Sequence, residues 1–387
     1  MRLPDLLTGA AGRVAFLTGI RSVAAGFLVA GLFTYCFLTL AGRVLGPAAF
    51  APISTLWAMV FIVGPGLFLP LQQELGRVLA REPVEGSGAL VLRRTAGLAA
   101  AVSGGAVVTG LLAGPWLTAE LFGGHWSIFW CFEISVVAYA VSFLARGVFS
   151  GLGDFPTFGR LVASESVIRF AVAGALVLVG IRTPGAFGAA IAVAPLLSTM
   201  VLTRLGRRLA LAPGSDVGRR ELLRAFGWLL MASLLGQALA NAAPIAVQLL
   251  APPDDDGSAG RFLSALVIAR VAIYLFQAAQ ATIVPNFAVL SVQGRVEDVR
   301  LALRRMVGVC LGLTVVGTTG AYLLGPMVVR ILFGPGFVIS NVTMAILTAA
   351  STVYVLAAAL SSAAIATGRH RLSGVAWLAG CVTFAAG

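Results

Sequence analysis

A few polar and charged side chains interrupt the long apolar runs of this sequence, and these residues could do chemistry. Arg270, Tyr274 and Gln277 lie in one run at a spacing that puts them on one face of a helix. Gln237 and Asn241 share a face in the preceding run. An arginine at mid-membrane costs roughly 2.5–3.5 kcal/mol unless it faces protein or water. We therefore favour a cavity-lining role for Arg270, whereas the amides would serve equally well as hydrogen-bond bridges between packed helices.

Acidic residues in the apolar runs are the candidates for ion coupling. Glu165 and Arg169 have the i, i+4 spacing of an ion pair within one helix, and we prefer self-neutralisation to ligand binding for them. Glu133 has no partner in its own run, so it needs a cation from a neighbouring helix or a proton. It is a candidate proton-coupling carboxylate, and pairing with Arg146 or Arg169 is the structural alternative.

Motifs typical of enzymes are missing. The sequence contains no GxxxxGK[ST], no HExxH and no GxSxG. Its four cysteines lie inside apolar runs without metal-like or paired spacing, as expected of buried thiols. We expect no enzymatic activity, no cofactor and no metal site.

The composition predicts a membrane protein. Of 387 residues, 59% are hydrophobic and 11% are charged, whereas a soluble domain carries about 25% charged residues. The net charge of +12 could suggest nucleic-acid binding. However, the basic residues are all arginines in short segments between apolar runs, where they determine membrane topology. We expect no nucleic-acid partner.

Apolar runs of about 20 residues recur along the chain, each long enough to cross the hydrocarbon core as a helix. Eleven such runs predict an all-α polytopic membrane protein: 22–42, 50–72, 95–117, 127–149, 161–181, 185–203, 226–250, 262–290, 306–332, 338–366 and 372–387. With a cytoplasmic N-terminus, 21 arginines fall in inside segments, four in outside segments and two within runs. This bias supports that orientation.

One segment occurs twice. A shift of 211 positions lays Arg93–Gly123 on Arg304–Gly334, and each copy reads as an arginine pair, an apolar run, Gly-Pro and Leu-Phe-Gly. We interpret each copy as a helix with a cationic start and a broken end. Both copies run inside to outside, which predicts two pseudo-symmetric parallel bundles, as in transporters. We place the bundles at 1–208 and 209–387. The last run ends 16 residues after Arg371, so we expect a truncated or missing final helix.

Several motifs give the sequence a resemblance to bacterial polysaccharide-biosynthesis flippases of the multidrug/oligosaccharidyl-lipid/polysaccharide exporter superfamily. These motifs are Arg146-Gly147, Gly151-Leu152-Gly153 with Phe155, the Glu165/Arg169 pair, Gly42-Arg43-Val44-Leu45-Gly46-Pro47 and the two Leu-Phe-Gly ends. The resemblance implies two six-helix bundles in the bacterial cytoplasmic (inner) membrane.

The resemblance also implies a function, the flipping of a polyprenyl-diphosphate-linked oligosaccharide by alternating access for cell-surface polysaccharide synthesis. Guanidinium groups suit a diphosphate, which makes Arg270 the first candidate ligand, followed by Arg169 and Arg21. Glu133 and Glu165 would be the coupling residues. Expected partners are the lipid-linked glycan, membrane lipids, and glycosyltransferases or a polymerase of the same pathway. The alternatives are an ion-coupled multidrug or small-molecule exporter of the same superfamily and a non-transporting scaffold for cell-wall assembly.

Overall fold

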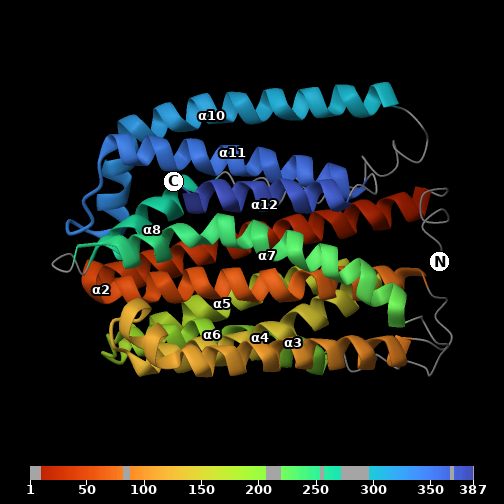
Figure 1. Ribbon diagram of the computed structural model, residues 1–387, viewed down its shortest axis with the longest axis horizontal. Helices are drawn as coiled ribbons and strands as arrows, with labels where there is room; N and C mark the ends of the chain where they lie inside the picture. Colours follow the sequence, from red (N-terminus) through yellow and green to blue (C-terminus); the bar gives the residue numbers. More distant parts are fainter. Residues whose placement is uncertain are drawn as a thin grey trace.

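The computed structural model describes residues 10–81, 88–205, 219–252, 257–271, 296–366 and 370–386. In these ranges the chain is helical, without a strand, and most helices lie along the long axis of the molecule (Figure 1). The elements are α2 (Ala10–Arg81), α3 (Gly88–Trp116), the π-turn η1 (Leu117–Leu121), α4 (Trp126–Gly151), α5 (Phe155–Leu178), α6 (Pro184–Leu205), α7 (Arg219–Leu250), α8 (Ser258–Ala269), α10 (Val296–Phe333), α11 (Asn341–Ala366) and α12 (His370–Ala386).

The first two predicted spans are the two arms of α2, which folds back on itself at Gly46. Gly46 has φ 73° and ψ 171°, a backbone conformation open to glycine but strained for other residues. Pro47 follows and cannot donate the hydrogen bond that would continue the first arm. The predicted loop of residues 43–49 is therefore a sharp helical corner.

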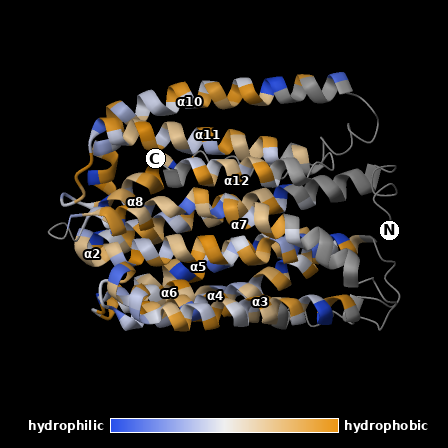
Figure 2. Ribbon diagram, in the orientation of Figure 1, coloured by the Kyte–Doolittle hydropathy of each residue, from blue (hydrophilic) through white to orange (hydrophobic). Residues whose placement is uncertain are grey.

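The helices have the length and surface of a multi-pass membrane protein. Within the described ranges, eight helices are long and apolar enough to cross a membrane, and the two-armed α2 is one of them. Figure 2 shows hydrophobic or neutral residues over most of the length of α3 and α10. Trp116, Trp126 and Trp130, half exposed at one end of the bundle, suit a membrane interface.

The two copies of the sequence repeat occupy opposite sides of the bundle. In Figure 1, α3 and α10 are outer helices that both run away from the end marked N. Both copies end on a left-handed glycine, Gly123 (φ 56°) and Gly334 (φ 112°). The predicted helix break occurs only in the first copy, where α3 passes into η1 after Pro115. In the second copy the α-helix continues through Pro326 to Phe333, so a broken end was wrong there.

α2 is the central packing element. It packs against α4 and α5 on one side and against α7 and α8 on the other. Small residues permit the closest contacts: a Cβ on Gly26 would lie 2.4 Å from the carbonyl oxygen of Gly159 in α5. Most of the buried side chains of α2 belong to its second arm, which packs with α4 and α6 in the main hydrophobic core.

The predicted eighth span, 262–290, is described only over its first third. Within it, α8 ends at Ala269 and Arg270 is its C-cap residue. Tyr274 and Gln277 lie outside the described residues.

Candidate functional site

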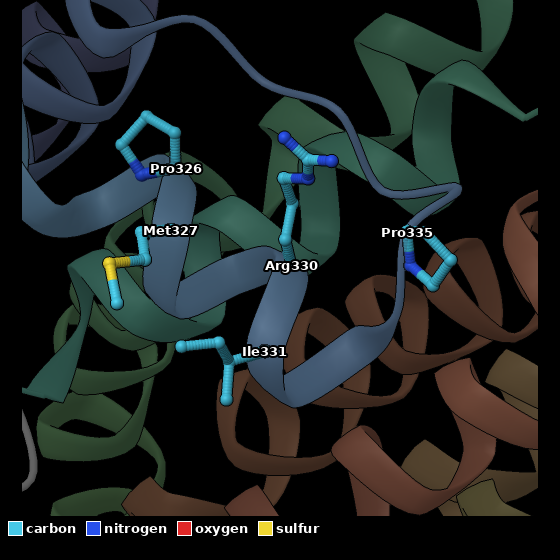
Figure 3. Close-up of a pocket in the computed structure, with 5 residues that line it drawn as sticks. All are labelled: Pro326, Met327, Arg330, Ile331 and Pro335. Atoms are coloured by element: carbon cyan, nitrogen blue, oxygen red, sulfur yellow. The ribbon is translucent and has the colours of Figure 1, made fainter.

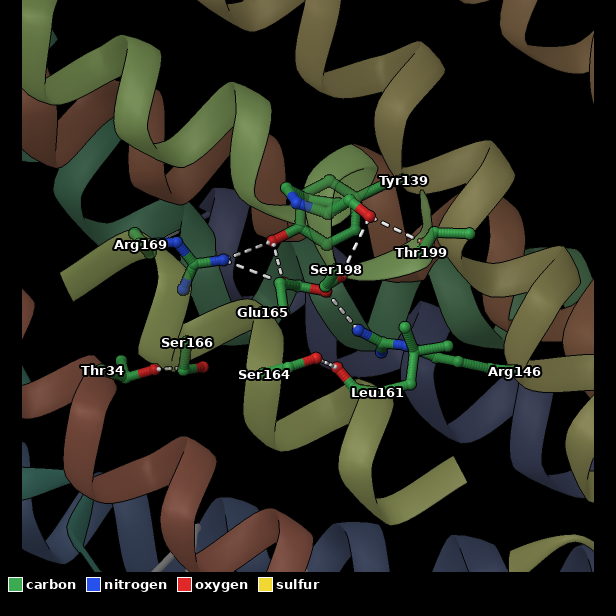
Figure 4. Close-up of polar contacts among 11 residues, drawn as sticks. Thr34, Tyr139, Arg146, Leu161, Ser164, Glu165, Ser166, Arg169, Ser198 and Thr199 are labelled. Atoms are coloured by element: carbon green, nitrogen blue, oxygen red, sulfur yellow. Dashed lines mark hydrogen bonds and ion pairs between the residues drawn. The ribbon is translucent and has the colours of Figure 1, made fainter. Parts of the chain in front are cut away.

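Four polar side chains of α4 and α5 form one buried group, which we call the arginine–glutamate cluster: Tyr139, Arg146, Glu165 and Arg169. Arg169 Nη2 donates to Glu165 Oε1 at 2.8 Å and to the Tyr139 hydroxyl at 3.0 Å. The Tyr139 hydroxyl donates to the same carboxylate oxygen at 2.9 Å. Arg146 Nη2 pairs with the other oxygen of Glu165 (Figure 4).

The arginine–glutamate cluster is enclosed by aromatic rings. Arg169 is 1% exposed, and its guanidinium lies 5.2 Å from the centre of the Trp57 ring of α2. The guanidinium of Arg146 lies 4.8 Å from the Phe143 ring. Such contacts stabilise a desolvated cation. Two guanidinium groups share one carboxylate, so the cluster carries one surplus positive charge.

The arginine–glutamate cluster tests the predicted ion pair of Glu165 and Arg169 and bears on the predicted role of Arg169 in substrate binding. The ion pair of Glu165 and Arg169 is present, as their spacing predicted. Arg169 is so enclosed that it could contact a substrate only after the helices around it had moved. Tyr139 was missed, although Tyr139 and Arg146 are seven residues apart and share a face of α4.

Glu133 of α4 is the other buried acid of this half. It is 5% exposed, and neither carboxylate oxygen has a hydrogen-bond partner in the described part of the chain. Its carboxyl group faces Gly110 of α3, where a Cβ would come within 2.0 Å of Oε1. The structural alternative of pairing with Arg146 or Arg169 is wrong for this conformation, because both arginines bind Glu165.

A second polar group, the amide–arginine cluster, consists of Gln237 and Asn241 of α7 and Arg270 at the end of α8. Arg270 Nη1 donates to Asn241 Oδ1 at 3.1 Å. Asn241 Nδ2 donates to the Gln237 carbonyl at 3.0 Å and lies 3.3 Å from Gln237 Oε1. Arg270, the first residue of one predicted polar stripe, therefore contacts Asn241 of the other.

Arg21 belongs to neither cluster. Its side chain is exposed on the first arm of α2. Near the end of the second arm, Glu74 forms an ion pair with Arg77, as an interfacial acid would. The structure therefore brings together Arg270 with the amides and Arg169 with Glu165, and leaves Arg21 apart from both.

The two halves of the chain pack together around the corner at Gly46, and we call this contact the corner clasp. A Cβ on Gly260 of α8 would lie 2.4 Å from the Pro47 carbonyl oxygen. The Phe50 ring is centred 6.2 Å from that of Phe333 at the end of α10. Arg43 Nη2 donates to a carbonyl oxygen near the end of α10 at 2.9 Å. At this end the halves leave little room between them.

An open hollow lies beside the corner clasp, at the end of α10. Pro326, Met327, Arg330, Ile331 and Pro335 line it (Figure 3). Its exposed arginine, Arg330, lies in the last turn of α10, where a cation suits the helix dipole. None of the predicted site residues that the structure describes is among those that line this hollow.

Comparisons with known proteins support the fold. No protein-family model matches the chain. An uncharacterized protein of Mycobacterium tuberculosis is 26% identical over 373 residues, covering 94% of this chain and 83% of that protein. An uncharacterized protein of Mycobacterium bovis is 25% identical over 390 residues, covering 97% and 86%.

Solved structures of transporters share the architecture. An inward-facing multidrug resistance MATE family transporter of the MOP superfamily has a TM-score of 0.67 at 16% identity, covering 94% of this chain and 86% of that one. The outward-facing conformation of a multidrug resistance MATE family transporter has a TM-score of 0.65 at 15% identity, with 96% and 86% covered. A MOP superfamily transporter from Pyrococcus furiosus, described as having a binding pocket of reverse polarity, has a TM-score of 0.63 at 14% identity, with 93% and 84% covered. The chain has the fold of these transporters.

Proposed function

We propose that this protein is an ion-coupled membrane transporter that exports a small amphiphilic molecule by alternating access. One observation carries the proposal: 94% of the chain follows the architecture of a multidrug resistance MATE family transporter. Fold alone does not specify function, so the polar residues must supply the remaining support.

The distribution of buried polar groups fits a transporter. Among the described residues, each half of the chain contains a polar cluster inside largely apolar helices, and burying such groups in a membrane is energetically costly. The corner clasp packs the halves together at one end through glycine and proline contacts. Rocking of the halves about such a contact would expose the polar groups alternately to the two sides.

A second candidate function is the flipping of a lipid-linked oligosaccharide with an anionic diphosphate. The observation that favours it is the number of buried or part-buried guanidinium groups: Arg146 and Arg169 share Glu165, and Arg270 donates to the amide oxygen of Asn241. The pocket of reverse polarity reported for the Pyrococcus furiosus transporter indicates that this fold accommodates different charge patterns.

A liposome assay separates these functions. Purified protein would be reconstituted with an imposed proton or sodium gradient, and two probes compared: a fluorescent cationic dye and a fluorescent polyprenyl-diphosphate glycan. Gradient-driven dye movement supports the exporter, and glycan translocation supports the flippase. Absence of movement of either probe would refute transport of these substrates and favour the scaffold.

Arg270 provides the matched variant. The flippase predicts that Arg270→Ala abolishes glycan translocation, because the guanidinium would bind the diphosphate, while Arg21→Ala serves as an exposed-arginine comparison. Wild-type glycan translocation by Arg270→Ala would reject that role. The exporter predicts that Arg270→Ala retains movement of a cationic dye, because a cation needs no guanidinium partner.

A further inference from the structure

Glu133 lies in a notch built by small residues of α3. A Cβ on Gly110 would overlap its Oε1, so the carboxyl group could not keep its present position beside any other residue. One turn along α3, a Cβ on Gly114 would lie 3.1 Å from the Phe129 ring of α4. The two helices therefore meet through two glycine notches, one filled by an aromatic ring and the other by a carboxyl group.

The second half of the chain offers an internal comparison. Gly325 of α10, the repeat equivalent of Gly114, faces Met344 of α11, as Gly114 faces Phe129. One turn after Met344 is Thr348, whose hydroxyl donates to the Met344 carbonyl at 2.9 Å. One turn after Phe129 is Glu133. Only the first half has an acid there, so packing of the repeat does not require one.

In the part of the chain that the structure describes, no cation pairs with Glu133. Buried charged side chains of the neighbouring helices pair with one another: Glu165 with Arg146 and Arg169, and Glu74 with Arg77. Glu120 is exposed in η1, and the titratable thiol of Cys131 lies 3.6 Å from the Gly185 carbonyl. Among the described residues of α2, α3, α5 and α6, none forms an ion pair with Glu133.

A bare carboxylate in this notch would be unstable. Removing an ionised carboxylate from water without a partner costs several kcal/mol, whereas a protonated carboxyl group is far cheaper to bury. The contact between α3 and α4 is therefore compatible with the protonated acid. Loss of the proton would require water at Glu133. Water can enter only if α3 moves away from α4 and breaks the contact between Gly110 and Glu133.

We propose that Glu133 is a proton-binding site whose occupancy keeps α3 packed on α4. Protonation closes the notch, and deprotonation separates the two helices. Its use as the coupling site rests on the proposed transport function, but proton binding and helix movement do not. The ligand is a proton, and α3 is the element that responds.

Chemical labelling tests the proton site directly. A hydrophobic carbodiimide reacts with protonated carboxyl groups in apolar surroundings and leaves a stable acylurea that mass spectrometry can locate. With purified protein in detergent, we expect Glu133 to be labelled at about pH 5 and not at about pH 9. Exposed carboxyl groups are already mostly ionised at about pH 5, so labelling at that pH distinguishes Glu133 from them. Absence of labelling at both pH values, or equal labelling at both, would overturn the proposal.

Helix movement tests the response. Spin labels at Leu112 of α3 and Leu178 of α5, which are 81% and 88% exposed, would report their separation in a cysteine-free background. We expect the distance to increase on raising the pH in the parent and to stay constant in Glu133→Gln, which cannot ionise. Gly110→Ala should give the separated distance at both pH values, and Gly104→Ala, with open space around its Cβ, should behave like the parent.

An unchanged distance in the parent, or the same pH response in Glu133→Gln, would overturn the proposal. Neither measurement uses a transported substrate. Failure here therefore leaves the transport proposal standing, and failure of the liposome assay leaves the proton site standing.

Discussion

Removal of the carboxylate from the arginine–glutamate cluster should strongly destabilise the first half of the chain. Glu165 forms ion pairs with both Arg146 and Arg169, whose side chains are 12% and 1% exposed. Glu165→Gln preserves the shape of the side chain and removes the negative charge that these two cations share. Breaking a buried pair in this way costs about 3–5 kcal/mol, a factor of roughly 100–4000 in the folded-to-unfolded ratio.

Tyr139→Phe is the matched control within the same cluster. It removes one hydroxyl that donates to Glu165 and accepts from Arg169, without changing any charge. Loss of these hydrogen bonds should cost about 1–2 kcal/mol. The difference between the two variants then measures the charge effect, separated from local packing.

The double variant Glu165→Gln/Arg169→Gln sharpens the test. It restores the net charge of the cluster, so it should be less destabilised than Glu165→Gln alone, although it carries more changes. The assay is unfolding in mixed detergent micelles, followed by tryptophan fluorescence; Trp57 touches the cluster through Arg169. A cost for Glu165→Gln no greater than that of Tyr139→Phe, or additive costs in the double variant, would refute the reasoning.

Three further predictions concern the helix contacts. Gly260→Ala places a Cβ 2.4 Å from the Pro47 carbonyl oxygen, and this overpacking should weaken the corner clasp by about 1–3 kcal/mol. A cysteine introduced at the corner clasp should then react faster with maleimide, and an unchanged rate of labelling would contradict the prediction. In Gly159→Ala the new Cβ would lie 2.4 Å from the Ser22 carbonyl oxygen, so this variant should unfold at a lower midpoint in detergent. Gly174 has open space around its Cβ position, so Gly174→Ala should leave the midpoint unchanged or raise it. Arg43→Gln removes a charged donor to a carbonyl of α10 and should raise labelling at the corner clasp as Gly260→Ala does; a parent-like rate would show that the hydrogen bond is dispensable.

Local patterns were sufficient to predict the class of the protein. An apolar run of about 20 residues specifies a membrane helix, because each span must form all of its backbone hydrogen bonds within itself. The ion pair of Glu165 and Arg169 was also predictable, since i, i+4 neighbours meet on any helix. The glycines that end the two repeats were visible as Leu-Phe-Gly, although the shape of the preceding turn was not.

The partners between helices required the tertiary structure. Whether Arg146 meets Glu165 depends on how α4 is rotated and shifted along α5. The hydrogen bond of Arg270 with Asn241 likewise depends on where α8 ends beside α7. Hydropathy cannot specify these contacts, because many rotations of an apolar helix bury similar areas. Close packing at glycine notches such as Gly110 selects one of them and leaves Glu133 without a partner.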